Sequence, residues 1–293
     1  MLTDNVQRTA LDNGLTLLTR EVHSAPVVSF WIWYRVGSRN ERPGLTGISH
    51  WVEHMQFKGT PSHPQGDFDR LVQREGGVFN GMTWLDWTAY YETLPSDRID
   101  LALRIEADRM VNSLFDPDET ESERTVIIAE REGRENQPTF LLYEQVQALS
   151  FLAHPYHHRV IGWKEDLHAI TRADLYRHYR QHYAPNNAVI VAVGDFETAD
   201  MVGRISERFG PIPKGGGQSP VRVQEPPARG ERRIRMEGPA GATYVVISHR
   251  APQAHHPDFF PMVVLDAVLG GAKGMPPFGN SGLGRSARLY RAL

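Results

Sequence analysis

Two histidines and a glutamate near the N-terminus form the motif that most constrains this chain. His50 and His54 are four residues apart, so on a helix their side chains project from one face, about 40° apart. Imidazole nitrogen is a common zinc ligand, and two histidines on one helical face supply half of a tetrahedral site. Glu53 precedes the second histidine, where it can reach a water activated by the metal. The order H-x-x-E-H predicts a helix that carries a hydrolytic zinc site.

A surface helix whose side chains merely face solvent is the competing interpretation, because the chain has 13 histidines in 293 residues. A zinc hydrolase also needs a third protein ligand. A helix is expected from Pro117, where Glu123, Ile127 and Glu130 fall within about 60° of one another. Carboxylates beside an apolar side chain would be costly if unpaired. One of the two glutamates is therefore the expected ligand and the other an orienting group for a histidine. Helical phase alone does not choose between them.

Several short stretches occur in an order that resembles one peptidase family. They are GLTG at 44–47, FKGT at 57–60, GGVFNGMT at 76–83, DWTAYY at 86–91, HPY at 154–156 and SARLY at 286–290. With the zinc motif, they make the chain similar to the pitrilysin/insulinase superfamily of inverted-motif zinc peptidases, and most similar to its mitochondrial-processing-peptidase-like branch. The resemblance covers nearly the whole chain.

The resemblance assigns the metal ligands and the catalytic glutamate. The family places its glutamate ligand about 76 residues after the second histidine, which selects Glu130, and an acidic residue seven positions earlier, which is Glu123. It implies one zinc ion per chain, held by His50, His54 and Glu130. Glu53 would then activate the attacking water, and Glu123 would orient a histidine.

The resemblance also implies a peptide-binding edge strand that contains Asn80 and Gly81, where an extended substrate pairs through its backbone. Relatives usually have Ala at the position of Gly81, so glycine is expected to leave more room and a less rigid edge. A plain hairpin is the alternative, because Asn and Gly are frequent turn residues. The histidines at 154, 157 and 158 are expected to be loop or packing residues, because no acid at ligand spacing accompanies them.

The periodicities predict an α+β chain. Strands are expected at 15–19, 27–34, 78–83, 88–94 and 189–193, and helices at 45–58, 68–75, 97–112, from 117 to a break at Pro138, then to 148, and at 172–182. The family has homologous α/β domains, each with an antiparallel-rich sheet packed with helices. Residues 1–222 are expected to form the complete N-terminal zinc peptidase domain. Residues 223–293 are expected to begin a second, apparently truncated copy, with a strand at 243–248 and a helix at 259–269.

Composition limits the classes of protein, the zinc ligands and the compartments that are compatible with this chain. The formal charge of −3 favours neither a nucleic-acid binder nor a polybasic membrane module. Without cysteine, a zinc ion must be held by nitrogen and oxygen ligands. No span long and apolar enough for a membrane is expected, nor a secretory signal or transit peptide. A bacterial cytoplasmic enzyme is therefore predicted, with the mitochondrial matrix or the periplasm as alternatives.

The function expected from the resemblance is a zinc metalloendopeptidase that cuts peptides or presequence-like segments. Relatives supply an Arg and a Tyr from late in the second domain, beyond residue 293. Either the chain is a fragment, or a partner subunit supplies those groups, or the activity is compromised. A homodimer, or a heterodimer with a related subunit, is expected, and the chain alone should be weakly active or inactive. The alternative is a non-catalytic or partner-dependent peptide-binding subunit. The glycine-rich stretch at 270–284 lacks P-loop spacing and is expected to be a chamber-facing loop or a disordered segment.

Overall fold

The computed structural model describes residues 4–216, 220–238, 241–271 and 288–292. The chain divides into two compact units. The first unit is Met1–Val246 and the second is Ile247–Leu293. The first contains a six-stranded sheet with the order β1-β2-β6-β3-β5-β4. The strands are β1 Gln7–Ala10, β2 Thr16–Glu21, β3 Val27–Tyr34, β4 Val78–Thr83, β5 Thr88–Pro95 and β6 Ala188–Gly194. Only β2 and β6 pair in parallel, so the predicted antiparallel-rich α+β fold is confirmed.

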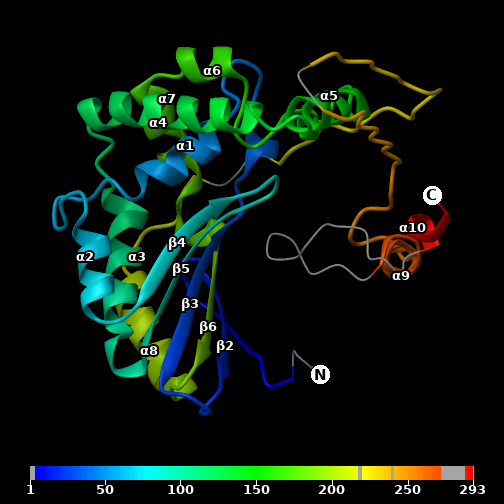
Figure 1. Cartoon of the computed structure of the whole chain (residues 1–293). Helices are drawn as coiled ribbons and strands as arrows, with labels where there is room; N and C mark the ends of the chain where they lie inside the picture. Colours follow the sequence, from blue (N-terminus) through cyan, green and yellow to red (C-terminus); the bar gives the residue numbers. More distant parts are fainter. Residues whose placement is uncertain (1–3, 217–219, 239–240, 272–287, 293) are drawn as a thin grey trace. The chain divides into compact units, whose positions relative to one another are not determined.

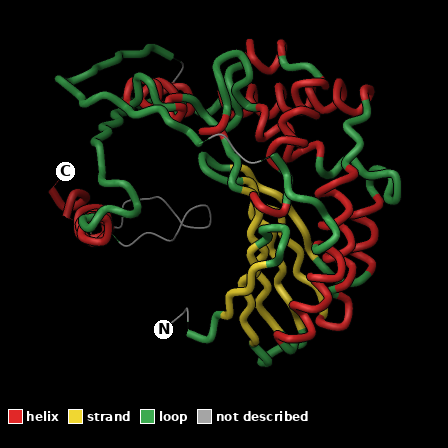
Figure 2. Tube along the Cα trace, turned by 180° about the vertical axis from the view of Figure 1, so that it is seen from behind, coloured by secondary structure: helices red, strands yellow, loops and turns green. Residues whose placement is uncertain are grey.

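Helices α2 Asp67–Arg74, α3 Asp100–Asn112 and α8 Thr198–Phe209 lie along one face of this sheet (Figures 1 and 2). Helices α1 Ile48–Met55, α4 Pro117–Glu135, α6 Lys164–Ala169 and α7 Arg172–His182 gather at one end of the sheet, and α5 Phe140–Ser150 lies away from the face that α2, α3 and α8 cover. The alternation of buried and half-buried side chains along β3 shows which face of the sheet the helices cover, because successive side chains of a strand point to opposite sides. Phe30 and Ile32 are buried under the helices, whereas Trp31 and Trp33 are half-buried and stack on the other face. No helix in the described ranges is both long and apolar enough to cross a bilayer.

A charged cluster is buried between α3 and the sheet. Arg109 donates from Nε to Glu106 Oε2 at 2.9 Å and from Nη2 to Glu92 Oε1 at 3.3 Å. Its guanidinium also lies over the ring of Tyr90, 4.1 Å from the centroid. All three charged side chains are at most 1% exposed. Two carboxylates and one guanidinium therefore depend on one another for charge compensation.

The C-terminal part of the chain confirms one sequence prediction and corrects another. A helix, α9 Phe259–Gly270, matches the expected helix, and α10 Arg288–Ala292 follows it. The strand expected at 243–248 is wrong, because the structure has no strand at those residues and they do not join the six-stranded sheet, and a strand needs a paired neighbour to satisfy its backbone groups. Most of the glycine-rich stretch at 270–284 lies outside the described residues.

Candidate metal centre and active site

The helix that carries the zinc motif starts later than its sequence pattern predicts, at Ile48 rather than 45. Gly47 takes a φ of 88°, and a Cβ there would lie 2.6 Å from the carbonyl oxygen of Ile161, so only glycine fits. The buried carboxylate of Glu41 then accepts from the first backbone N–H groups of the helix. Its oxygens lie 2.9 Å from Gly47 N and 2.8 Å from Ser49 N. These two oxygens satisfy donors at the helix N-terminus, although burial raises the pKa of the Glu41 carboxyl to about 8.

Helix α4 brings its glutamates to the same place. The side chain of Asp116 accepts from the backbone N–H groups of Asp118 and Glu119 at 2.9 and 3.2 Å, so it caps the helix, which begins at the predicted Pro117. Helices α1 and α4 are in contact. Glu130 therefore comes from a well-defined helix that packs against the zinc-motif helix.

Three donor atoms converge between these two helices. The Nε2 atoms of His50 and His54 are 3.2 Å apart, and Glu130 Oε2 lies 3.7 Å from the first and 3.8 Å from the second. Ligands about 2.0–2.1 Å from one ion at tetrahedral angles are about 3.3–3.5 Å apart. Among the described residues, this is the one group of three whose donor atoms lie within 4.8 Å of one another and that could hold a metal ion. The spacing and the nitrogen–oxygen donor set fit zinc.

The surroundings act differently on the pKa values of the two histidines. Burial alone would lower the pKa of His54, but its hydrogen bond with Glu123 and the nearby carboxylates raise it. Burial lowers the pKa of His50 well below its ordinary value, so its ring remains neutral. His54 Nδ1 lies 2.7 Å from Glu123 Oε1, and Nδ1–H donation to that carboxylate leaves the Nε2 lone pair facing the other donors. Lys58 Nζ lies 2.5 Å from Glu123 Oε2. Burial alone would raise the pKa of Glu123, but hydrogen bonds with His54 and Lys58 outweigh it and hold the carboxylate ionised.

Glu53 lies beside the three donors but is not one of them. Burial raises the pKa of its carboxyl, although the charge of His54 and a hydrogen bond from Thr83 oppose that shift. Thr83 donates to Glu53 Oε2 at 2.9 Å. A buried carboxylate of raised basicity next to a metal-binding group is suited to accept a proton.

Asn80 and Gly81 lie on β4, the edge strand of the sheet on this side. The Asn80 side-chain oxygen accepts from the Gly81 backbone N–H at 2.8 Å. The expectation that Gly81 leaves extra room is wrong. A Cβ there would lie 2.9 Å from Tyr90 Cδ1 and 3.0 Å from Phe57 Cε2, because aromatic rings already fill the space that a methyl group would take.

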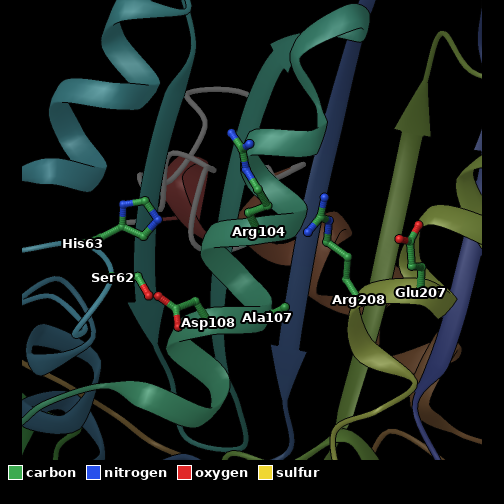
Figure 3. A pocket seen from close by; sticks show the side chains of 7 residues that line it. All are labelled: Ser62, His63, Arg104, Ala107, Asp108, Glu207 and Arg208. Atoms are coloured by element: carbon green, nitrogen blue, oxygen red, sulfur yellow. The ribbon is translucent and has the colours of Figure 1, made fainter.

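Other candidate clusters lie apart from the metal centre. His154 Nδ1 accepts from the backbone N–H of Tyr156, as expected of a loop histidine, and neither it nor its neighbours joins a metal-binding group within the described ranges. A surface cavity of about 400 Å³ shares no residue with the metal centre (Figure 3). Its lining is Ser62, His63, Arg104, Ala107, Asp108, Glu207 and Arg208.

Three supporting residues were not found from the sequence. Arg134 Nη2 donates to Glu130 Oε1 at 2.5 Å, and its i,i+4 spacing could have suggested the pair. Glu41 and Thr83 had no such signal, because each reaches the site from a separate segment of the chain. The Nδ1 atom of His50 is buried without a hydrogen-bond partner among the described residues. Of the two histidines, only His54 has its Nδ1 atom hydrogen-bonded to a carboxylate.

The fold and the donor set together define the class of α+β proteins with an inverted H-x-x-E-H metal centre between two helices. Two family models match the chain. The insulinase (peptidase family M16) model matches residues 16–162, and the model described as the peptidase M16 inactive domain matches residues 169–293. The chain belongs to the insulinase family of peptidases, as the resemblance predicted.

Relatives named as zinc proteases and processing peptidases are similar over most of this chain. A zinc protease, PqqE, of Helicobacter pylori is 30% identical over 90% of this chain and 60% of its own length. The mitochondrial-processing peptidase subunit beta of Blastocladiella emersonii is 28% identical over 90% of this chain and 56% of its own length. A crystal structure of a protease from H. pylori superimposes with a TM-score of 0.71 at 31% identity, over 75% of this chain and 54% of that one. The chain thus spans about 60% or less of these relatives.

The boundary between the two family models does not coincide with a boundary in the sheet. Strand β6, at Ala188–Gly194, belongs to the part that the second model matches, yet it lies between β2 and β3. Residues beyond 169 therefore complete the sheet that supports the metal-binding helix.

Proposed function

We propose that the chain contains the zinc site of a metalloendopeptidase that hydrolyses peptides or presequence-like segments. The observation that carries the proposal is the convergence of His50, His54 and Glu130 within ligand distance, with Glu53 beside them. The assigned ligands are the two histidines and Glu130, for one zinc ion per chain.

Each residue has a chemical role in this proposal. When bound, zinc supplies a Lewis acid that makes water acidic and polarises the substrate carbonyl. Glu53 accepts the proton of the attacking water and passes it to the leaving amine. Glu123 keeps His54 in the tautomer that binds metal, and Arg134 holds the second oxygen of Glu130.

We further propose that substrate pairs with the outer edge of β4 next to Asn80 and Gly81. An extended peptide added to a sheet edge is bound mainly through its backbone, which tolerates varied sequences. The Gly81 N–H now donates to its own neighbour's side chain, and a substrate carbonyl would replace that acceptor. Because Thr83 of the same strand contacts Glu53, substrate bound along this edge would lie next to the proposed base.

The remaining proposals concern organisation and setting. We place the N-terminal zinc peptidase domain at residues 1–222 and the start of a second homologous domain at 223–293. We propose a homodimer or a heterodimer with a related subunit. Apolar residues of α9 such as Phe260 and Val264, which are 73% and 63% exposed, are available for such a contact. The bacterial cytoplasm remains the proposed compartment.

The alternative is a peptide-binding subunit without catalysis or dependent on a partner. It is favoured by the limited share of the relatives that the chain spans and by the match of residues 169–293 to a domain described as inactive. Against it, the chain keeps all the metal donors and the glutamate that catalysis requires. A non-catalytic subunit would bind peptide without cleaving it, whatever its metal content.

Zinc content and peptide cleavage test the proposal together. The purified chain should bind one zinc ion, and Glu130→Gln should lose most of it. Glu121→Gln is the matched control, because Glu121 lies on the same helix but pairs with Arg124 at the surface. Equal zinc in the Glu130 and Glu121 variants would remove Glu130 from the ligand set.

Glu53→Gln separates catalysis from metal binding. It should retain zinc while cleavage of an unstructured fluorogenic peptide falls by about 10²–10⁴-fold, the usual contribution of a general base. Turnover within about threefold of wild type would contradict the role of Glu53. Peptide binding without zinc-dependent cleavage by the wild-type chain, alone or with a related subunit, would favour the alternative.

A further inference from the structure

Thr83 and Thr88 form a buried hydroxyl pair behind Glu53. Thr83 ends β4 and Thr88 begins β5, and the two residues face each other across the antiparallel ladder. Their hydroxyl oxygens are 3.3 Å apart. Thr83 is 9% exposed and Thr88 is fully buried, so neither hydroxyl depends mainly on solvent for its hydrogen bonds.

The proton directions in this pair are determined by its neighbours. Thr88 Oγ1 donates to the backbone carbonyl of Val36 at 2.9 Å, and a hydroxyl has only one proton to give. Thr88 can therefore act towards Thr83 only as an acceptor. The hydroxyl of Thr83 has two acceptors for its single proton, Thr88 Oγ1 at 3.3 Å and Glu53 Oε2 at 2.9 Å. The shorter contact, to a carboxylate, is the stronger one.

Thr83 consequently holds Oε2 of Glu53 by a hydrogen bond, and Oε1 remains available to accept a proton in the proposed reaction. Within the described part of the chain, Oε2 accepts from Thr83 and Oε1 makes no hydrogen bond. The threonine side chain is short and its χ1 angle is restricted by branching at Cβ, so the contact is rigid. It rests on two paired strands rather than on a loop, which is the kind of support that an aligned catalytic group requires.

We propose that Thr83 is the positioning residue of Glu53, and that Thr88 and the Val36 carbonyl in turn orient the Thr83 hydroxyl. The inference rests on the proposed peptidase function, in which Glu53 Oε1 receives the proton of the attacking water. The Thr83 hydroxyl contacts Glu53 and Thr88 rather than any of the three metal donors. Its hydroxyl keeps the Glu53 side chain in one rotamer, so that proton transfer does not require a prior rearrangement.

Two substitutions at Thr83 separate its hydroxyl from its shape. Thr83→Val keeps the volume and the branching but removes the donor, whereas Thr83→Ser keeps the donor. Thr93→Val is the matched control, because Thr93 lies on the same hairpin and bonds Ser29 instead. At equal zinc content, Thr83→Val should lower kcat roughly 10- to 100-fold with KM within about twofold, as expected for the loss of a hydrogen bond to a charged group. Thr83→Ser and Thr93→Val should stay within about threefold of wild type.

A kcat for Thr83→Val within threefold of wild type overturns the inference. So does an equal loss in Thr83→Ser, because that result would indicate a packing role. A double-mutant cycle of Thr83→Val with Glu53→Gln, measured as shifts of the urea unfolding midpoint, tests the contact without any activity. Additive shifts overturn it. Non-additive shifts in a chain that cleaves no peptide, alone or with a related subunit, would retain the hydrogen bond but reject the proposed function and the positioning role with it.

Discussion

Replacing Arg109 by Met should destabilise the first unit strongly, because it removes the one cation that compensates two buried carboxylates. Arg109 contacts Glu106 through Nε and Nη2 and Glu92 through Nη2, and both glutamates are 0% exposed. Breaking a buried ion pair from one side costs about 3–5 kcal/mol. That is a large part of the roughly 5–15 kcal/mol by which domains are stable.

The loss should depend on pH in a defined direction. Burial, and then the charge of Glu106, raise the pKa of Glu92 well above its ordinary value, whereas Arg109 lowers it. Removing Arg109 raises that pKa further. A carboxyl whose pKa is higher in the folded state contributes most stability below the unfolded pKa of about 4.3, and this contribution is lost as the pH rises towards the folded value. The variant should therefore be closer to wild type at pH 5.5 than at pH 8.

Urea unfolding followed by tryptophan fluorescence measures this loss, since the chain has six tryptophans. Arg104→Met is the matched control. Arg104 lies exposed on the same helix, forms no ion pair with any described residue, and should change stability by less than about 0.5 kcal/mol. Adding Glu92→Gln and Glu106→Gln to Arg109→Met should recover part of the loss. A loss below about 1 kcal/mol, or the same loss at both pH values, would refute the reasoning.

Three further substitutions test the site and its supports. Glu123→Gln should weaken zinc binding about 10- to 100-fold in chelator competition, because it loosens the partner of His54; unchanged affinity would contradict that role. Gly81→Ala should lower stability by about 1–3 kcal/mol, since its methyl group would overlap the rings behind it, and a neutral effect in urea unfolding would mean that the rings move aside easily. Glu41→Gln should cost about 2–5 kcal/mol by the same assay, because an amide donor would face a helix N–H; a loss under 1 kcal/mol would count against this cap.

The candidate metal centre was largely predictable because helical geometry is local. Two histidines four apart must share a face, and the phase of Glu123 and Glu130 placed both on one stripe before the resemblance separated their roles. The sequence of β3 was equally informative, because side chains alternate between the two faces of a strand and the pattern therefore indicates which of them are buried. These features depend only on residues that are close together in the chain, so they can be read from the sequence.

What the sequence could not predict depends on contacts between distant segments. Residues 243–248 have strand-forming side chains, yet a strand exists only where another strand pairs with it. The space at Gly81 is filled by rings from two other segments, so its residue type alone suggested the wrong volume. Thr83 ends one of the stretches that carry the resemblance, but its role depends on the contact with Glu53, which the sequence does not display. The roles of these residues come from tertiary packing, to which local propensity gives no access.

The position of β6 also determines when this molecule can assemble during synthesis. The strand that ends at Gly194 is inserted between β2 and β3, which are translated long before it. At about 5–20 residues per second, a ribosome needs on the order of ten seconds to proceed from His54 to the end of β6. For that time the nascent chain carries the histidines on a segment whose supporting sheet is still divided. His50 and His54 are thus made well before the strand that completes the sheet beneath their helix.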